Sequence, residues 1–394
     1  MDTKLLLIIA TLFQCALLSA CGGGDDNQPN NNPSTSVPVT TPETPDSLCI
    51  GDNTQINWDA LMTEDCPLLA QYGLFSNQND PTQNPRQGGF LYQLSTQLFS
   101  NYANKYRFVF LPDGAKITFN PSDTFELPVG TVLSKTFALP LDTTLSGREH
   151  ETIIETRLLI HRESGWTALP YFWHQGEAKL ASTGADVSHT LNRQGEQLTF
   201  NYHVPSRAEC KLCHQRTIDG RSHINPIGLK SQLLNHDIQI AGKLSNQLTY
   251  WQQQNWIEGL EDISLLTSAP EITDDSASLI NRAKGYLDIN CAHCHRAEGF
   301  ASISGLRLGF HVDHTSYQYG ICKQPPGWDG GEKGLSYDII PGDAEHSIVL
   351  YRQELNSAKD RMPPIGRTLV HVEATEVIRQ WIDSLSPTLG NCQQ

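Results

Sequence analysis

The chain has 394 residues, a formal net charge of −15 at pH 7 and 38% hydrophobic residues. Its length predicts two or three domains, and its composition is typical of a folded protein with a buried core. The strong negative charge makes nucleic acid and anionic lipid poor partners, whereas a redox partner with a basic docking face would be attracted electrostatically.

The first twenty residues have the pattern of an export signal. Lys4 precedes an apolar run over residues 5–13, and Leu-Leu-Ser-Ala at 17–20 precedes Cys21. A run this short is unsuited to span a membrane. The ending Leu-Ser-Ala-Cys resembles a bacterial lipobox, which implies that Cys21 is lipidated, and Gly22 after it implies sorting to the outer membrane. An ordinary signal peptide that happens to precede a cysteine is the alternative.

Residues 21–47 are nearly all Gly, Asp, Asn, Pro, Ser and Thr. Such a segment has little to bury and cannot offset the entropy lost on ordering. We therefore expect a disordered tether between a lipid anchor and the folded part of the chain.

Residues 48–205 are predicted to form a β-rich domain, with a short helical lead-in at 59–75. The turn Pro112-Asp113-Gly114 stands between two strand-like segments, 106–110 and 116–119, and predicts a hairpin. We expect a small β-sandwich or barrel. The further strand candidates are residues 131–137, 152–161, 166–173 and 197–203.

Two five-residue segments carry the strongest chemical signal. The first motif is Cys210-Lys211-Leu212-Cys213-His214, and the second motif is Cys291-Ala292-His293-Cys294-His295. Each is a Cys-x-x-Cys-His, in which two thiols bind the vinyl groups of haem and the histidine binds its iron. The composition predicts only about 0.01 chance occurrences of this pattern. The sequence therefore predicts two covalently bound haem c groups, with His214 and His295 as proximal ligands.

Two rival interpretations of the cysteine pairs are weaker. A zinc ribbon brings its pairs within about 15–20 residues, whereas these lie roughly 80 residues apart. A redox-active dithiol of the thioredoxin type would need a strand-to-helix setting that neither pair has.

Helical patterns surround both motifs. Residues 206–268 form the first haem region, with helices expected at 228–234 and 245–257. Residues 276–386 form the second haem region, where a helix over 276–290 runs into Cys291 and an amphipathic helix over 373–385 closes the chain.

Met362 is the predicted distal ligand of the second haem. It precedes Pro363 and Pro364, which stiffen an extended loop after the second motif. A helix leading into the motif, a late Met-Pro-Pro and a terminal helix resemble a class I cytochrome c domain. Packing of Met362 in the core is the alternative.

The first haem has no evident distal ligand in the sequence. Pro226 lies where class I domains often have a proline whose carbonyl orients the proximal histidine. An open iron is one possibility, and a histidine ligand is the other. The histidines considered are His223, His236, His174, His189 and His203.

Four cysteines remain after the signal, the lipid site and the haem motifs are subtracted. An even number in an oxidising compartment suggests two disulfides. Of the three possible pairings we favour Cys49 with Cys66 and Cys322 with Cys392.

The chain over roughly residues 70–386 resembles a family of bacterial dihaem c-type cytochromes, exported and with a β-rich N-terminal part. The segments that carry the resemblance are residues 71–75, 155–159, 288–295 and 340–343. The expected fold is an α+β multidomain chain, a β-sandwich or barrel-like domain followed by mainly α cytochrome c-type haem domains.

The leading functional hypothesis is electron transfer by an exported lipoprotein, more a carrier than a catalyst. A peroxidase- or oxidase-like dihaem enzyme with an open first haem is the second hypothesis. A ligand-binding β module with a haem redox readout is the third.

Overall fold

The computed structural model describes residues 47–50, 54–260 and 262–392. The predicted signal peptide, the lipidation of Cys21 and the tether up to residue 46 lie outside these residues. Residues 47–394 belong to one unit. No helix of the described residues is long and apolar enough to cross a membrane.

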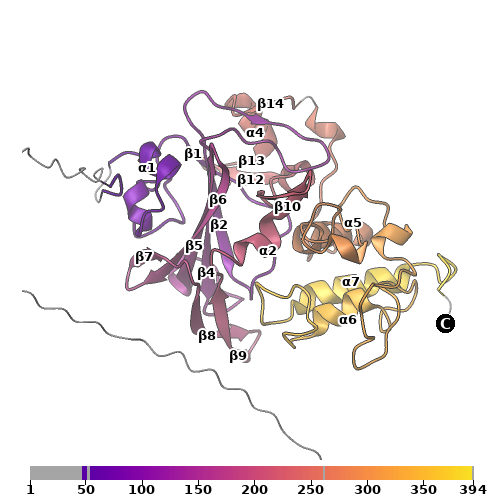
Figure 1. The fold of residues 1–394 in the computed structure, drawn as a ribbon. Helices are drawn as coiled ribbons and strands as arrows, with labels where there is room; N and C mark the ends of the chain where they lie inside the picture. The colour runs from indigo at the N-terminus through magenta and orange to yellow at the C-terminus, as the bar shows by residue number, and fades with distance from the viewer. Residues whose placement is uncertain (1–46, 51–53, 261, 393–394) are drawn as a thin grey trace, which may run out of the picture. The chain divides into compact units, whose positions relative to one another are not determined.

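A six-stranded antiparallel sheet forms the centre of this unit (Figure 1). Its strands are rich in aromatic and β-branched residues, which favour a pleated, half-buried surface. In spatial order they are β1 (Gly89–Leu91), β2 (Asn104–Phe110), β4 (Val132–Pro140), β5 (Glu151–Arg162), β6 (Gly165–His174) and β7 (Glu177–Leu180).

Both faces of the sheet are covered, because alternate residues of each strand enter different cores. Phe108 and Phe110 pack with α1 (Trp58–Thr63) and η1 (Leu69–Tyr72). Val109 packs on the opposite face with α3 (Ser231–Leu234) and α4 (Gln247–Gln253). The face that carries Val109 is the one turned toward the two Cys-x-x-Cys-His motifs.

The remaining strands form four two-stranded sheets. The β8–β9 hairpin leads directly toward the first motif, and two small hairpins follow it. The strands are β8 (Ala185–Arg193) with β9 (Glu196–Val204), β10 (Gln215–Ile218) with β11 (Arg221–Ile224), β12 (Asp237–Ile240) with β13 (Lys243–Asn246), and β3 (Ile117–Thr118) with β14 (Ile257–Glu258).

The last third of the described chain contains three α-helices joined by long irregular segments. They are α5 (Leu279–Leu287), α6 (Ile348–Glu354) and α7 (Val372–Ser384). The amphipathic pattern of the closing helix is confirmed, since Val377, Ile378, Trp381 and Ile382 are buried. Short helical turns are η2 (Arg148–His150), η3 (Ile263–Leu265), η5 (Ser302–Ser304) and η6 (Tyr317–Tyr319).

The predicted fold class is wrong. Strand outweighs helix in the structure, at 28% against 21%, and the mainly α cytochrome c-type domains are not formed. Residues 206–268 contain two hairpins beside their short helices, because tight turns at Asp219-Gly220 and Ala241-Gly242 favour strand pairing there. The large sheet has β1 and β7 as its edges, so it is not closed into a barrel.

The predicted hairpin around Pro112-Asp113-Gly114 is also wrong. Strand β2 pairs with β1 and β4, whereas β3 pairs in parallel with β14. The backbone N–H of Ile117 donates to the carbonyl of Trp256 at 2.8 Å. A partner 140 residues away has therefore replaced the local one, which no turn signal could indicate.

Both favoured disulfides are confirmed. Cys49 is bonded to Cys66, and Cys322 is bonded to Cys392. The four described cysteines outside these bonds are those of the two motifs, and all four are free.

Candidate functional site

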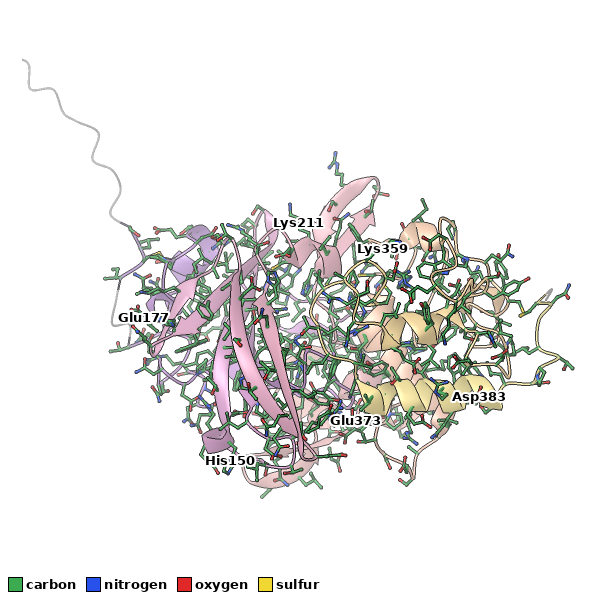
Figure 2. All side chains as sticks on the ribbon, turned by 90° about the horizontal axis from the view of Figure 1, so that it is seen from below. His150, Glu177, Lys211, Lys359, Glu373 and Asp383 are labelled. Carbon is green, nitrogen blue, oxygen red and sulfur yellow. A yellow bond between two sulfur atoms is a disulfide. The ribbon has the colours of Figure 1, made fainter. Side chains whose placement is uncertain are left out.

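The first motif forms a short helix, α2 (Cys210–His214), six residues after β9. The carboxylate of Glu209 accepts a hydrogen bond from the backbone N–H of Ser206 at 2.7 Å, and the Ser206 carbonyl accepts from the N–H of Cys210 at 3.2 Å. This turn starts the helix and directs Cys210 inward, where it is buried. Lys211 in the same helix is exposed (Figure 2).

The imidazole of His214 is oriented for metal binding. Its Nδ1 lies 2.7 Å from the carbonyl oxygen of Asn225, which leaves Nε2 as the nitrogen that can bind iron. The sequence predicted that the Pro226 carbonyl would do this, but the preceding carbonyl does. Burial lowers the pKa of His214 to about 4, so the ring is neutral at pH 7, as a metal ligand must be.

A large cavity lies beside these residues. It has about 1230 Å³ of empty space, a figure that includes open solvent. Cys210, Cys213 and His214 form one wall, and the sheet forms another. The third wall comes from Asn290 and His293 of the second motif's segment.

The two motifs are in direct contact. The Cys294 thiol lies 3.2 Å from the carbonyl oxygen of Leu212. The ligand atoms of Cys213, His293 and Cys294 all lie within 4.8 Å of one another. Nearby, the N–H of Thr217 donates to the Glu298 carbonyl at 2.8 Å and so joins β10 to the segment after the second motif.

This contact gives the two thiols different acidities. A hydrogen bond from the Cys294 thiol, which outweighs burial, lowers the pKa of Cys213 well below its usual value. The same interaction raises the pKa of Cys294.

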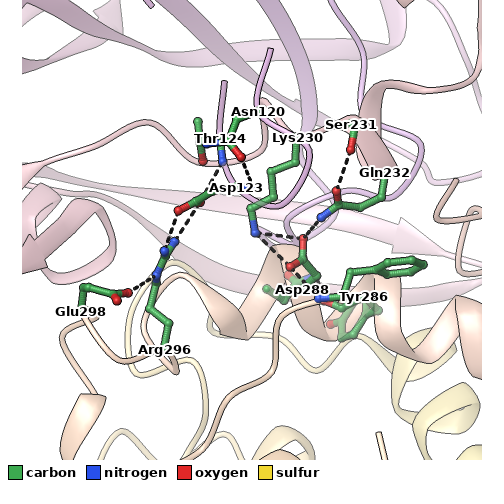
Figure 3. Close-up of polar contacts among 12 residues, drawn as sticks. Asn120, Asp123, Thr124, Lys230, Ser231, Gln232, Tyr286, Asp288, Arg296 and Glu298 are labelled. Atoms are coloured by element: carbon green, nitrogen blue, oxygen red, sulfur yellow. Dashed lines mark hydrogen bonds and ion pairs between the residues drawn. The ribbon is translucent and has the colours of Figure 1, made fainter. Parts of the chain in front are cut away.

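Two ion-pair clusters hold the motif-bearing segments together (Figure 3). The buried Asp288, in η4 (Asp288–Ala292), accepts hydrogen bonds from the ammonium of Lys230 at 2.9 Å and from the amide of Gln232 at 3.2 Å. Asp123 pairs with Arg296 at 2.7 Å and with Arg216 at 3.1 Å. Both clusters join residues near one motif to residues near the other.

The second motif is divided among pockets: His293 lines the large cavity, and two other residues line two further pockets. Cys291 and Met362 line a small pocket, together with His371. His295 lines a different cavity, and its Nδ1 lies 3.0 Å from the Ser304 hydroxyl. The structure thus brings Met362 to Cys291, but it does not bring His295 into that pocket. Burial lowers the pKa of His295 to about 4.

The histidines considered for the first haem lie in different places. Among them only His203 lines the large cavity, and its two ring nitrogens contact Asp186 at 2.8 Å and Glu209 at 3.1 Å. The others are engaged or exposed elsewhere: His189 with the Pro140 carbonyl, His236 with Gln247, His174 stacked on Phe172, and His223 exposed in β11.

Sequence reasoning missed two histidines. His293 lines the large cavity, and its Nδ1 is buried without a hydrogen-bond partner in the described residues. Its position inside the second motif was the available signal. His371 lines the Met362 pocket and stacks on Phe99 with ring centroids 4.2 Å apart. The sequence signal for His371 was weak: it directly precedes the closing helix.

The residues of the first motif fit a covalently attached haem. Both thiols are free, the imidazole has one anchored nitrogen, and a largely apolar cavity adjoins them. The buried nitrogen of His293 is a polar atom that a group in this cavity could satisfy. No protein-family model matches the chain, and no match was found among curated proteins or solved structures.

Proposed function

We propose that the protein carries two covalently bound haem c groups, one at each motif, and transfers electrons. Haem iron supplies a one-electron couple when bound. The observation that carries the proposal is the contact between two Cys-x-x-Cys-His segments that are distant in sequence: Cys213 of one lies beside Cys294 of the other, and all four motif thiols are free. Every other described cysteine is in a disulfide.

The chain's own residues have distinct parts in this proposal. The thiols of Cys210 and Cys213 would hold one group in the large cavity, and His214 would offer Nε2 to its iron. Cys291 and Cys294 hold the other, with His295 as its proximal ligand. Met362 is the proposed distal ligand, and the pocket that it lines with Cys291 supports this role, whereas His295 lines a different cavity.

The proposed location is the outer membrane, with a lipid on Cys21 as the anchor. It rests on the sequence of the first 22 residues alone. The net charge of −15 supports a redox partner with a basic docking face. Association with such a partner should weaken as salt is added, because exposed charges are screened.

Haem content tests the proposal. The full chain, expressed in a host that matures c-type cytochromes, should contain two covalent haems by intact mass and by pyridine haemochrome absorbance. Cys210→Ala with Cys213→Ala should remove one of the two. Cys49→Ser with Cys66→Ser is the matched control and should remove neither. A wild-type chain without covalent haem would overturn the proposal.

A second candidate is a peroxidase-like enzyme with an open first haem. It is favoured by the lining of the large cavity, which includes no methionine and whose His203 already contacts two carboxylates. An iron without a sixth protein ligand can bind a small oxidant. If the first haem iron does have a sixth protein ligand, His293 is the candidate, because it lines the same cavity.

Cyanide titration separates the two candidates. A ferric wild-type spectrum that shifts on adding cyanide supports the enzyme, whereas two low-spin haems that ignore cyanide support simple transfer. If His293 is the closing ligand, His293→Ala should make the first haem responsive to cyanide.

A further inference from the structure

Three cations stand side by side across the middle of the sheet. Arg107 of β2 lies opposite Lys135 of β4, and Lys135 lies opposite Arg157 of β5. All three line the large cavity beside the first motif. Like charges on directly opposite strand positions repel one another, so this row is unfavourable unless something compensates it.

The neighbouring row on the same face is apolar. Val109, Leu133 and Leu159 lie opposite one another in the same register and pack in the core. The third row consists of Lys105, Phe137 and Glu155.

Charges of the described residues around this row do not balance. Among the described residues, Glu155 is the only carboxylate that forms an ion pair with the row, and its partner is Arg157, whose Nε donates to it at 2.8 Å. Arg107 is 2% exposed and donates to the neutral amide of Gln97 at 2.8 Å. Glu209 also lines the cavity, but it pairs with His203.

Lys135 lies between the two arginines and has no carboxylate partner among the described residues. Its ammonium lies 4.7 Å from the ring centroid of Phe137, which offers a partial compensation. The guanidinium of Arg157 lies over the same ring at 4.3 Å, so the ring is shared. Burial, with Arg107 and Arg157 nearby, lowers the pKa of Lys135 well below its usual value. A buried lysine in this setting is favoured as a cation only when an anion pairs with it.

We propose that Arg107, Lys135 and Arg157 form a carboxylate-binding site within the cavity that the first motif lines. The carboxylates are either the two propionates of a haem attached at Cys210 and Cys213, which rests on the proposed function, or those of a free dicarboxylic acid. Guanidinium and ammonium groups bind carboxylates through charge-assisted hydrogen bonds, and arginine can bind them with two parallel bonds.

Lys135→Gln tests the site in two forms of the full chain. In the haem-loaded protein it should lower the melting temperature, because a bound carboxylate loses its central partner. In the Cys210→Ala, Cys213→Ala background it should raise the melting temperature, because repulsion in the row is relieved. Lys135→Arg should behave as wild type. Lys243→Gln, exposed at the end of a hairpin, is the matched control and should change neither form.

The reduction potential of the first haem gives an independent readout. Loss of a nearby positive charge favours the ferric state, so Lys135→Gln should shift the ferric-to-ferrous ratio on the order of tenfold, about 59 mV for a one-electron couple. Lys243→Gln should leave the potential unchanged.

Succinate distinguishes the two sources of carboxylate. If propionates occupy the site, succinate should raise the melting temperature only in the background without the first haem. If a free acid is the ligand, succinate should stabilise the wild-type chain, whether or not it carries haem, and not Lys135→Gln. If the chain carries no haem, the proposed function is refuted, but the succinate measurement still tests this carboxylate site. Two results together would overturn the proposal. Succinate would leave every melting temperature unchanged, and Lys135→Gln would shift the melting temperature in the same direction with and without the first haem.

Discussion

The two Cys-x-x-Cys-His motifs are chemically alike and structurally different. The first is a regular helical turn whose thiols, imidazole and adjoining cavity lie together. The second overlaps the end of η4, and its residues face three separate pockets: Cys291, His293 and His295 each line a different one. Identical spacing in sequence therefore specifies a chemistry without specifying the pocket around it, because the walls of each pocket come from distant segments.

The ion pair between Asp288 and Lys230 joins the two motif regions, and its removal should have the largest effect on stability. Asp288→Asn should destabilise the protein by about 3–5 kcal/mol, since it leaves the buried Lys230 without its charged partner. Urea unfolding measures this change. Adding Lys230→Met should recover much of the loss. Asp113→Asn, on an exposed turn, should stay within about 0.5 kcal/mol of wild type.

The two disulfides provide a second test, because each belongs to a different region. Cys322→Ser with Cys392→Ser opens a loop with a sequence separation of 70 residues, against 17 for Cys49 and Cys66. In the chain-entropy account the losses are about 4 and about 3 kcal/mol. Thermal unfolding of both double variants should rank them in this order. The reverse order would show that native-state packing outweighs the loop entropy.

Acid should weaken the second link between the motif regions. Although burial raises it, the pKa of Asp123 is lowered from 3.8 to about 2 by the hydrogen bond and charge of Arg296, with Arg216 nearby. A lowered carboxyl pKa stabilises the fold above about pH 4, and this contribution is lost as the pH falls toward about 2. The loss should be about 1–2 kcal/mol. In Asp123→Asn this part of the acid dependence should disappear.

The smallest expected effect on stability comes from Met362→Ala, because Met362 is only partly buried. Its proposed role predicts a spectral change instead. The absorbance or magnetic signal of one haem should lose its His/Met character, and the other haem should be unchanged. An unaltered spectrum would refute Met362 as a ligand and direct attention to His371, which lines the same pocket.

Local patterns predicted local structure well. The strand segments around residues 106–110, 131–137, 152–161 and 166–173 are confirmed, as is the closing helix. That helix begins beside the sheet region, where the Tyr102 hydroxyl donates to Glu373 at 2.9 Å (Figure 2). The prediction of mainly α domains is wrong because the helices of residues 206–268 are short and tight turns between them favour two hairpins.

The sequence by itself determined the chemistry that this protein can carry: two motifs with thiols and histidines in fixed spacing, and four further cysteines left to pair. These features depend on covalent chemistry and on neighbours along the chain. The tertiary structure alone decided that the motifs touch, that Asn225 orients His214, and that Arg107, Lys135 and Arg157 share one row. Strand register and long-range packing fix these placements, because hydrogen bonds and burial between distant segments outweigh local preference.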